Sequence, residues 1–496
     1  MKTFSELLRK LGTGTNVSNT SYETAWIARL RDVDPEISNR ALDWICEHQL
    51  TDGSWGAEFP MYYHDRVICT LSAMIALTYK GRRHQDKVQI QKGLDALSEI
   101  TEGATRGLQA DPHGATVGFE MIVPTLVAEA EELGIIKQQK ERILGRLAQT
   151  REIKMKKLAG VQISRTVSIA HSSEMTGRDK IDLIDIENLQ ENNGSVANSP
   201  SATAHFALYV KPGDRNAMNY LSSISDPRNG GAPSFAPFDI LERTWVLWNL
   251  LLTDEKDDPE IMELCRPHVE YLERNWKNGQ GLGFSVECSL TDGDDTSVGQ
   301  KVLAAFGRVP DITALHSYEG EDWFRCYDHE SNPSIDVNLH FLDTFKQIGY
   351  DAGHPSVVKI IKFLRASQNS SGYWSDKWHV SPYYTTAHAI MAGLKYDDVM
   401  CEKSIDWILN AQKSDGSWGI YKSSTAEETA YCIQALDAWN KSGRKILKGK
   451  ILLARNWLIK HADEPHQPLW IDKSLYCPEV VVQSAILSAL SLSRDY

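Results

Sequence analysis

Three carboxylates within four positions are the residues of this chain best suited to chemistry. Asp292, Asp294 and Asp295 precede an apolar stretch, so they lie in a turn that leads into a buried helix. Carboxylates this close cannot all ionise, and one that stays protonated near neutral pH is a strong general acid. A solvated turn whose acidic residue caps the helix is the structural alternative. A calcium-binding EF-hand loop is excluded, because its sixth and twelfth positions require Gly and Glu and here hold Ser297 and Leu303.

A repeated string indicates which elements position this turn. The pattern Q-x-x-D-G-S-W begins at Gln49 and Gln412, and degenerate copies begin at Gln190 and Gln368. Each full copy follows an apolar helical stretch, so the string lies at a helix end. Its Gly permits a left-handed turn, its Asp and Ser bond nearby backbone groups, and its Trp packs on the neighbouring helix. Such repeats predict stacked helical hairpins, which close into an α/α barrel.

The remaining pattern predicts an all-α fold. Apolar residues recur at helical spacing, and alternating strand patterns are hard to find. The clearest helical segments are 122–133, 245–252, 357–364, 386–394, 430–439 and 480–492.

Composition narrows the function classes. The chain has 496 residues, of which 42% are apolar, without a run long enough to span a membrane. Its N-terminal segment carries charges among the hydrophobic residues, unlike a secretory signal, so we expect a soluble cytoplasmic protein. The formal charge of −13 argues against a nucleic-acid partner. Eight cysteines without a C-x-x-C pair suggest reduced, structural thiols.

Taken in order along the chain, these motifs resemble the terpene cyclases that start by protonation, which are squalene-hopene cyclases and class II diterpene cyclases. The acidic motif at 292–296 matches their D-x-D-D-T, and the repeats match as well. Further matching segments are 20–26 (Thr-Ser-Tyr-Glu-Thr-Ala-Trp), 117–120, 124–126, 193–195, 199–204 and 230–233. The chain is most similar to bacterial members that make halimadienyl or kolavenyl (clerodane-type) diphosphates.

The resemblance implies two α/α barrels and no class I α domain. One barrel, called β in this family, would comprise residues 1–19 plus 231–496 and carry the acidic motif. The other, called γ, would be inserted at residues 20–230. Its end falls in the Asp-Pro-Arg-Asn-Gly-Gly stretch at 226–231, which has the composition of a linker.

The resemblance also implies the reaction. Asp294 would protonate the terminal alkene of geranylgeranyl diphosphate, Asp292 and Asp295 would set its acidity, and Asn338 would hydrogen-bond the acid. The product would be a bicyclic diphosphate, which makes the enzyme an isomerase that leaves the diphosphate in place.

Aromatic side chains are needed to shield the carbocation, because their faces attract a cation and offer no lone pair. The candidates are Trp374, Trp378, Tyr383 and Tyr384. The structural alternative is that these residues belong to the hydrophobic core.

Two residues bear on how the reaction ends. In relatives that make ent-copalyl diphosphate, a His and an Asn hold the water that removes the last proton. His171 matches the His position, whereas the Asn position carries Ser234. This departure favours a rearranged product over ent-copalyl diphosphate, which remains the alternative.

Basic residues upstream of His171 are candidates for holding the diphosphate. They are Lys154, Lys156, Lys157 and Arg165. A solvated helix face is the alternative for such a charge run. The family implies Mg²⁺ as cofactor, which keeps most of its water and uses few protein carboxylates; Glu120 is the candidate ligand.

Class I metal motifs are not matched, since Asp397 and Asp398 lack the final Asp of D-D-x-x-D. A separate class I synthase or phosphatase would therefore process the product. Three other classes compete with this interpretation. A squalene-hopene cyclase would be longer, with more repeats and an apolar membrane-inserting patch. A protein prenyltransferase subunit would need an Asp, Cys, His zinc set, and a helical repeat protein without catalysis would need no acid.

Overall fold

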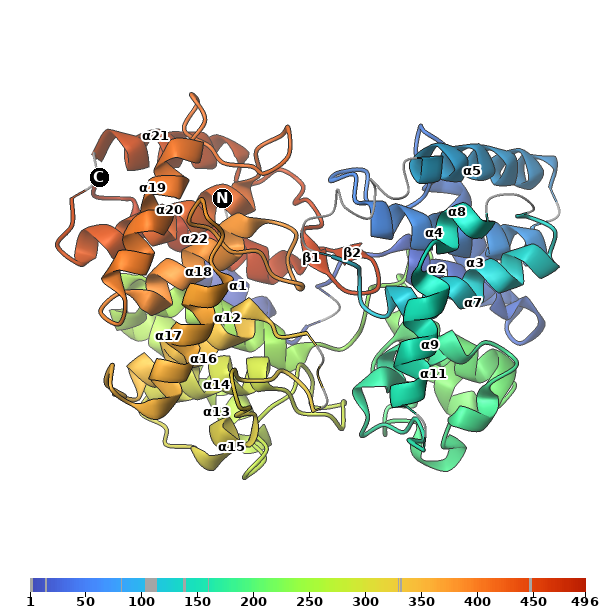
Figure 1. Ribbon diagram of the computed structural model, residues 1–496, viewed down its shortest axis with the longest axis horizontal. Helices are drawn as coiled ribbons and strands as arrows, with labels where there is room; N and C mark the ends of the chain where they lie inside the picture. The colour runs from blue at the N-terminus through green and yellow to red at the C-terminus, as the bar shows by residue number, and fades with distance from the viewer. Residues whose placement is uncertain are drawn as a thin grey trace.

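The protein is a mostly helical molecule of two barrels joined side by side, as the computed structural model shows (Figure 1). The structure describes residues 3–13, 16–81, 83–102, 114–136, 140–158, 160–328, 330, 332–445 and 448–496. The prediction of an all-α fold with α/α barrels is confirmed. Each of the eight cysteines is a free thiol, in agreement with the composition.

The β barrel is a closed ring of inner helices, each packed against the next and the last against the first. The inner helices are α12 (Asp239–Leu251), α14 (Gly293–Ala305), α16 (Ile335–Gln347), α18 (Pro382–Gly393), α20 (Ala426–Lys441) and α22 (Glu479–Leu492). Outside them lie α1 (Phe4–Lys10), η6 (Asp254–Asp257), α13 (Pro259–Asn275), α15 (Thr313–Ser317), α17 (Pro355–Ser367), α19 (Asp398–Ala411) and α21 (Lys448–His461). Inner helices are buried on nearly every face, whereas outer helices keep an exposed side.

The γ barrel closes in the same way around a smaller ring. Its inner elements are α2 (Ser21–Ala28), α4 (Tyr63–Lys80), α7 (Phe119–Glu132), η2 (Ser168–Thr176) and α10 (Pro200–His205). Around them lie η1 (Leu30–Asp32), α3 (Pro35–Glu47), α5 (His84–Glu102), α8 (Lys140–Leu144), α9 (Leu147–Lys157), η3 (Ile181–Leu183), η4 (Ile186–Asn188), η5 (Phe206–Val210) and α11 (Arg215–Ile224).

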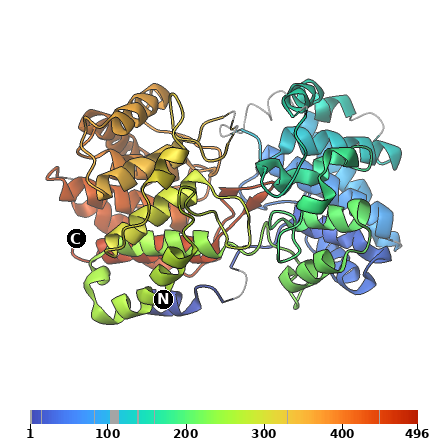
Figure 2. The same ribbon diagram turned by 90° about the horizontal axis from the view of Figure 1, so that it is seen from below.

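Each barrel has its own hydrophobic core. The first core joins Phe4, Leu7 and Val17 to residues from 235 to 490, because α1 packs on α13 and α22. The second core runs from Tyr22 to Ala232. The cores therefore divide the chain near residues 20 and 232, and the chain begins and ends in the same barrel (Figure 2).

A short antiparallel hairpin, which the sequence pattern did not predict, lies between the barrels (Figure 1). Its strands are β1 (Trp470–Ile471) and β2 (Leu475–Tyr476), and it precedes α22. The backbone N–H of Leu475 donates to Asp65 of the γ barrel at 2.8 Å. The hairpin therefore belongs to the β barrel by sequence and contacts the γ barrel at the start of β2.

The four repeats form one recurring structure. In each, the Gln side-chain amide donates to the carbonyl four residues later, at 2.8–3.1 Å. Where Trp is present, its indole N–H donates to the carbonyl ten residues earlier, at 2.7–2.9 Å, and so ties the turn to the preceding helix. These residues are Gln49, Gln190, Gln368 and Gln412, and Trp55, Trp374 and Trp418.

Within the described residues, every helix is too short or too polar to cross a membrane.

The glycine of the repeat is required sterically, which predicts a stability effect. Gly416 has φ +96°, and a Cβ there would lie 2.6 Å from the carbonyl carbon of Leu453. Gly416→Ala is therefore expected to reduce the free energy of unfolding by about 2 kcal/mol or more. Gly443→Ala is the matched control, because φ is +88° but no atom lies within 4 Å; its cost should be about 1 kcal/mol. Denaturant unfolding of both variants measures the difference, and equal losses would contradict the steric role.

Candidate active site

The acidic motif forms the start of α14 and is buried. Asp292 is the N-cap, and its side chain accepts the backbone N–H of Asp295 at 2.8 Å. Burial, with the charge of Asp294 adding to it, raises the pKa of Asp292 to about 7. Burial and the neighbouring carboxylates raise the pKa of Asp295 well above its usual range. The helix-capping alternative thus holds for Asp292, but the turn is not solvated, and the group retains protons near neutral pH.

Asp294 contacts a histidine that the sequence pattern did not reveal. Its Oδ1 lies 2.5 Å from Nδ1 of His340 on α16. The side chain of Asp294 keeps 19% of its surface exposed, whereas Asp292 and Asp295 are buried, so Asp294 is the carboxyl that a substrate can reach. With a proton on Nδ1 of His340, Oδ1 of Asp294 accepts from the ring, and Oδ2 is the oxygen left to carry a proton.

The expected hydrogen bond from Asn338 to the acid is wrong. The Asn338 amide donates to the carbonyls of Phe324 (3.0 Å) and Ser334 (2.8 Å) and accepts the N–H of Phe324 (2.9 Å). Residues two apart on a helix lie about 200° apart, so 338 and 340 cannot both face α14. Asn338 instead holds the loop whose Cys326 carbonyl accepts the N–H of Gly293, at the start of α14.

A fourth carboxyl faces the same region. Asp336 lies one turn before His340 on α16, and the charge of Asp294 acts on it. Neither of its buried oxygens has a hydrogen-bond partner among the described residues. Burial, and then the charge of Asp376, raise the pKa of Asp336 well above its usual range. The spacing of Asp336 and His340 was the one sequence signal that could have indicated the histidine.

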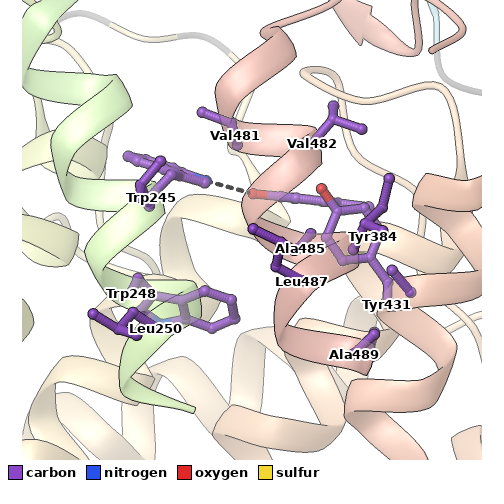
Figure 3. Packing of buried hydrophobic residues seen from close by; sticks show 14 of the residues in the cluster. Trp245, Trp248, Leu250, Tyr384, Tyr431, Val481, Val482, Ala485, Leu487 and Ala489 are labelled. Carbon is purple, nitrogen blue, oxygen red and sulfur yellow. Dashed lines mark hydrogen bonds between the residues drawn. The ribbon is translucent and has the colours of Figure 1, made fainter. Parts of the chain in front are cut away.

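Aromatic rings surround the region next to the acid. Tyr384 on α18 accepts the indole N–H of Trp245 at 3.1 Å (Figure 3). Its ring centroid lies 5.0 Å from Tyr431, 5.3 Å from Trp470 and 6.5 Å from His340. Trp245 in turn lies edge-on to His340, with centroids 5.4 Å apart. Trp245, Tyr431 and Trp470 were missed from the sequence. Helical spacing does not separate Trp245 and Tyr431 from core aromatics, and Trp470 lies in a hairpin that the sequence pattern did not predict.

The other expected aromatic residues lie elsewhere. Trp374 is buried in the core as the Trp of a repeat, which fits the structural alternative. Tyr383 packs on Trp407 of the outer helix α19, with centroids 4.8 Å apart. Trp378 is half-buried, with the Lys377 ammonium 5.1 Å from its ring. Of the four candidates, Tyr384 is the one placed next to the acid.

His171 and Ser234 meet at a carboxylate of the hairpin. His171 Nε2 lies 3.0 Å from Asp472 Oδ1, and the Ser234 hydroxyl donates to Oδ2 at 2.8 Å. Tyr476 of β2 is buried, and burial, followed by the charges of Asp472 and Asp295, raises its pKa well above its usual range. The sequence predicted that His171 and Ser234 act together, but it gave no sign of Asp472.

The four basic residues that are candidates for holding the diphosphate lie in different parts of the γ barrel. Lys154 lies 3.4 Å from Glu120, at the start of α7, where Val117 donates to the carbonyl of Asp472. Arg165 donates to the carbonyl of Gln190. Next to it, Glu191 accepts the backbone N–H of Ser289 at 2.9 Å, across the barrel junction. Lys156 pairs with Glu152 on the exposed surface, and the side chain of Lys157 lies outside the described residues.

Comparison with known proteins fits this geometry. Residues 326–448 match the model of the squalene-hopene cyclase C-terminal domain. The chain is 50% identical over 495 residues to a type B diterpene cyclase from Mycobacterium tuberculosis, which covers 99% of both chains. It is 30% identical to a (+)-kolavenyl diphosphate synthase from Herpetosiphon aurantiacus, over 98% of this chain and 95% of the other.

A solved structure shares the architecture over nearly its whole length. The ent-copalyl diphosphate synthase from Streptomyces platensis superposes with a TM-score of 0.77 at 26% identity, covering 96% of each chain. Similarity of sequence, of barrel architecture and of the buried acid motif therefore agree, and the chain belongs to the class II diterpene cyclase family of enzymes.

Proposed function

We propose that this enzyme cyclises geranylgeranyl diphosphate to a rearranged bicyclic diphosphate, of halimadienyl or kolavenyl type, without cleaving the diphosphate. The observation that carries the proposal is the contact of Asp294 with His340, within a buried group of carboxyls. Asp294 transfers its Oδ2 proton to the terminal alkene. The His340 N–H then stabilises the carboxylate that remains after proton transfer.

Three carboxyls that act electrostatically with Asp294 are buried. Asp292, Asp295 and Asp336 each have a raised pKa. These three groups retain protons at a pH where an exposed carboxyl would be ionised, so they place less negative charge around Asp294.

The carbocation formed next to Asp294 needs walls without lone pairs. The faces of Trp245, Tyr384, Tyr431 and Trp470 supply such walls, since an aromatic quadrupole attracts a cation but offers no nucleophile. The hydroxyl of Tyr384 is occupied by the Trp245 indole N–H. The rings therefore favour cyclisation over capture of the cation.

Lys154, Glu120 and Arg165 are proposed to hold the diphosphate end. No group of three or more metal-binding side chains occurs among the described residues. One carboxylate beside one ammonium, as in the Glu120 and Lys154 pair, suits a magnesium ion that arrives on a diphosphate and keeps most of its water. Bound there, Mg²⁺ would neutralise diphosphate charge, and Lys154 would contact phosphate oxygens.

His171 and Ser234 support a product formed after hydride and methyl shifts. The Ser234 hydroxyl donates to Asp472, so it is not directed at a water beside His171. A product that retains its diphosphate would then pass to a separate class I synthase or phosphatase. The presence of His171 keeps ent-copalyl diphosphate as the second candidate product.

The proposed role of Asp294 as proton donor predicts the effect of replacing its carboxyl group with an amide. Asp294→Asn keeps the shape but holds no acidic proton, so turnover should fall by about 10²–10⁴-fold or more while the fold remains intact. Product formation from geranylgeranyl diphosphate measures this, with Asp322→Asn on the exposed surface as the matched control. Activity of Asp294→Asn within about tenfold of wild type would contradict the assignment.

Retention of the diphosphate predicts that no pyrophosphate is released. Purified enzyme with Mg²⁺ should consume geranylgeranyl diphosphate, and the product should yield a diterpene alcohol after phosphatase treatment. A coupled pyrophosphate assay, with a class I terpene synthase as positive control, follows the reaction. Pyrophosphate released in step with substrate loss would overturn this part of the proposal.

The product skeleton tests the route by which the cation is quenched. NMR and mass spectrometry of the dephosphorylated wild-type product should show a halimadane or clerodane skeleton, with at least one migrated methyl or hydride. An unrearranged copalyl skeleton as the sole product would refute the rearranged assignment and support the second candidate.

A further inference from the structure

Asp472 joins three separate parts of the chain at the junction of the barrels. Its carboxylate accepts from His171 of the γ barrel at 3.0 Å and from Ser234 of the linker at 2.8 Å. Its backbone carbonyl accepts the N–H of Val117 at 2.9 Å. The side chain of Asp472 is 9% exposed and that of His171 is 18% exposed, so His171 is the more accessible of the pair.

Both ring nitrogens of His171 face hydrogen-bond acceptors. Nε2 faces Asp472 Oδ1, and Nδ1 lies 3.3 Å from the carbonyl of Ala197. A neutral imidazole has one N–H, so both acceptors are satisfied only when the ring is doubly protonated. The electrostatics agree: burial, the largest single effect, lowers the pKa of His171, but the charge and hydrogen bond of Asp472 together with the charge of Glu23 raise it above its usual value. Lys473 and Glu23 also act on the ring, in opposite directions.

We propose that Asp472 is a specificity-determining residue, which keeps His171 doubly protonated and so removes the lone pair that would otherwise deprotonate the first bicyclic cation. This inference rests on the proposed cyclisation. A neutral His171 could accept a proton from a carbon next to the cationic centre, while the C–H electron pair forms the alkene of an unrearranged copalyl-type product. Held as a donor, His171 takes no proton, the cation persists, and hydride and methyl shifts precede its loss of a proton to another base.

Substitution of Asp472 separates this role from that of Ser234. In Asp472→Ala, His171 can donate from Nδ1 to Ala197 and present a free Nε2. The ratio of unrearranged to rearranged product should rise by about tenfold or more, because a positioned base now competes with migration. Adding His171→Phe should return the ratio to near the wild-type value. Ser234→Asn is the contrasting variant: Asp472 still holds His171, so the rearranged product should persist.

Two outcomes of the product analysis would overturn the inference. An unchanged product ratio in folded Asp472→Ala would show that Asp472 does not control the outcome. A raised ratio that survives His171→Phe would show that His171 is not the base that Asp472 restrains. If wild type fails to cyclise geranylgeranyl diphosphate at all, the proposed function fails. The protonation state of His171 is then still measured in the substrate-free enzyme.

The protonation state of His171 is measured by NMR of protein labelled with ¹⁵N-histidine. The His171 signals are assigned by their loss in His171→Phe. Near pH 7, wild type should show a doubly protonated ring, and Asp472→Ala should show a neutral tautomer. Asp472→Asn provides the same comparison if the alanine variant does not fold, because the amide carries no charge. A neutral His171 in wild type would overturn the inference whatever the products are.

Discussion

A buried ammonium group of the hairpin is the charged anchor between the two barrels. Lys473, in the turn of the β1–β2 hairpin, is fully buried within the γ barrel. Its Nζ lies 2.8 Å from Glu174, 2.6 Å from Ser199 and 2.7 Å from Ser201. A buried charge is tolerated only when it is paired and hydrogen-bonded, so the hairpin can occupy this place in one arrangement. The position of Asp472, the preceding residue, follows from this arrangement.

The chemistry lies at the ends of the barrels where the inner helices begin. Asp294 lies in the first turn of α14, Tyr384 in the first turn of α18, and His340 in the second turn of α16. Helix N-termini carry partial positive charge, which would stabilise the Asp294 carboxylate left by the proposed protonation step. In the γ barrel, Glu120 likewise lies in the first turn of α7. The candidate residues of both barrels thus lie near helix starts.

Sequence reasoning agreed with the structure where a feature has a local signature. The acidic turn before an apolar helix indicated a retained proton, and burial of Asp292 and Asp295 agrees with it. The repeats indicated barrels, because their glycines and tryptophans act within a few residues or on one neighbouring helix. It did not succeed for Asn338, because the resemblance located the correct helix but not the face that looks toward Asp294.

What the sequence by itself determined is therefore the set of local structures and the acid motif. Helices, their glycine-bounded ends and the buried carboxyl turn all result from interactions between residues near in the chain. Tertiary structure alone decided which partner each group receives. His340 reaches Asp294 across the barrel, and Asp472 reaches His171 across the junction. Such contacts depend on the packing of whole helices and of two domains, which no spacing of residues along one segment encodes.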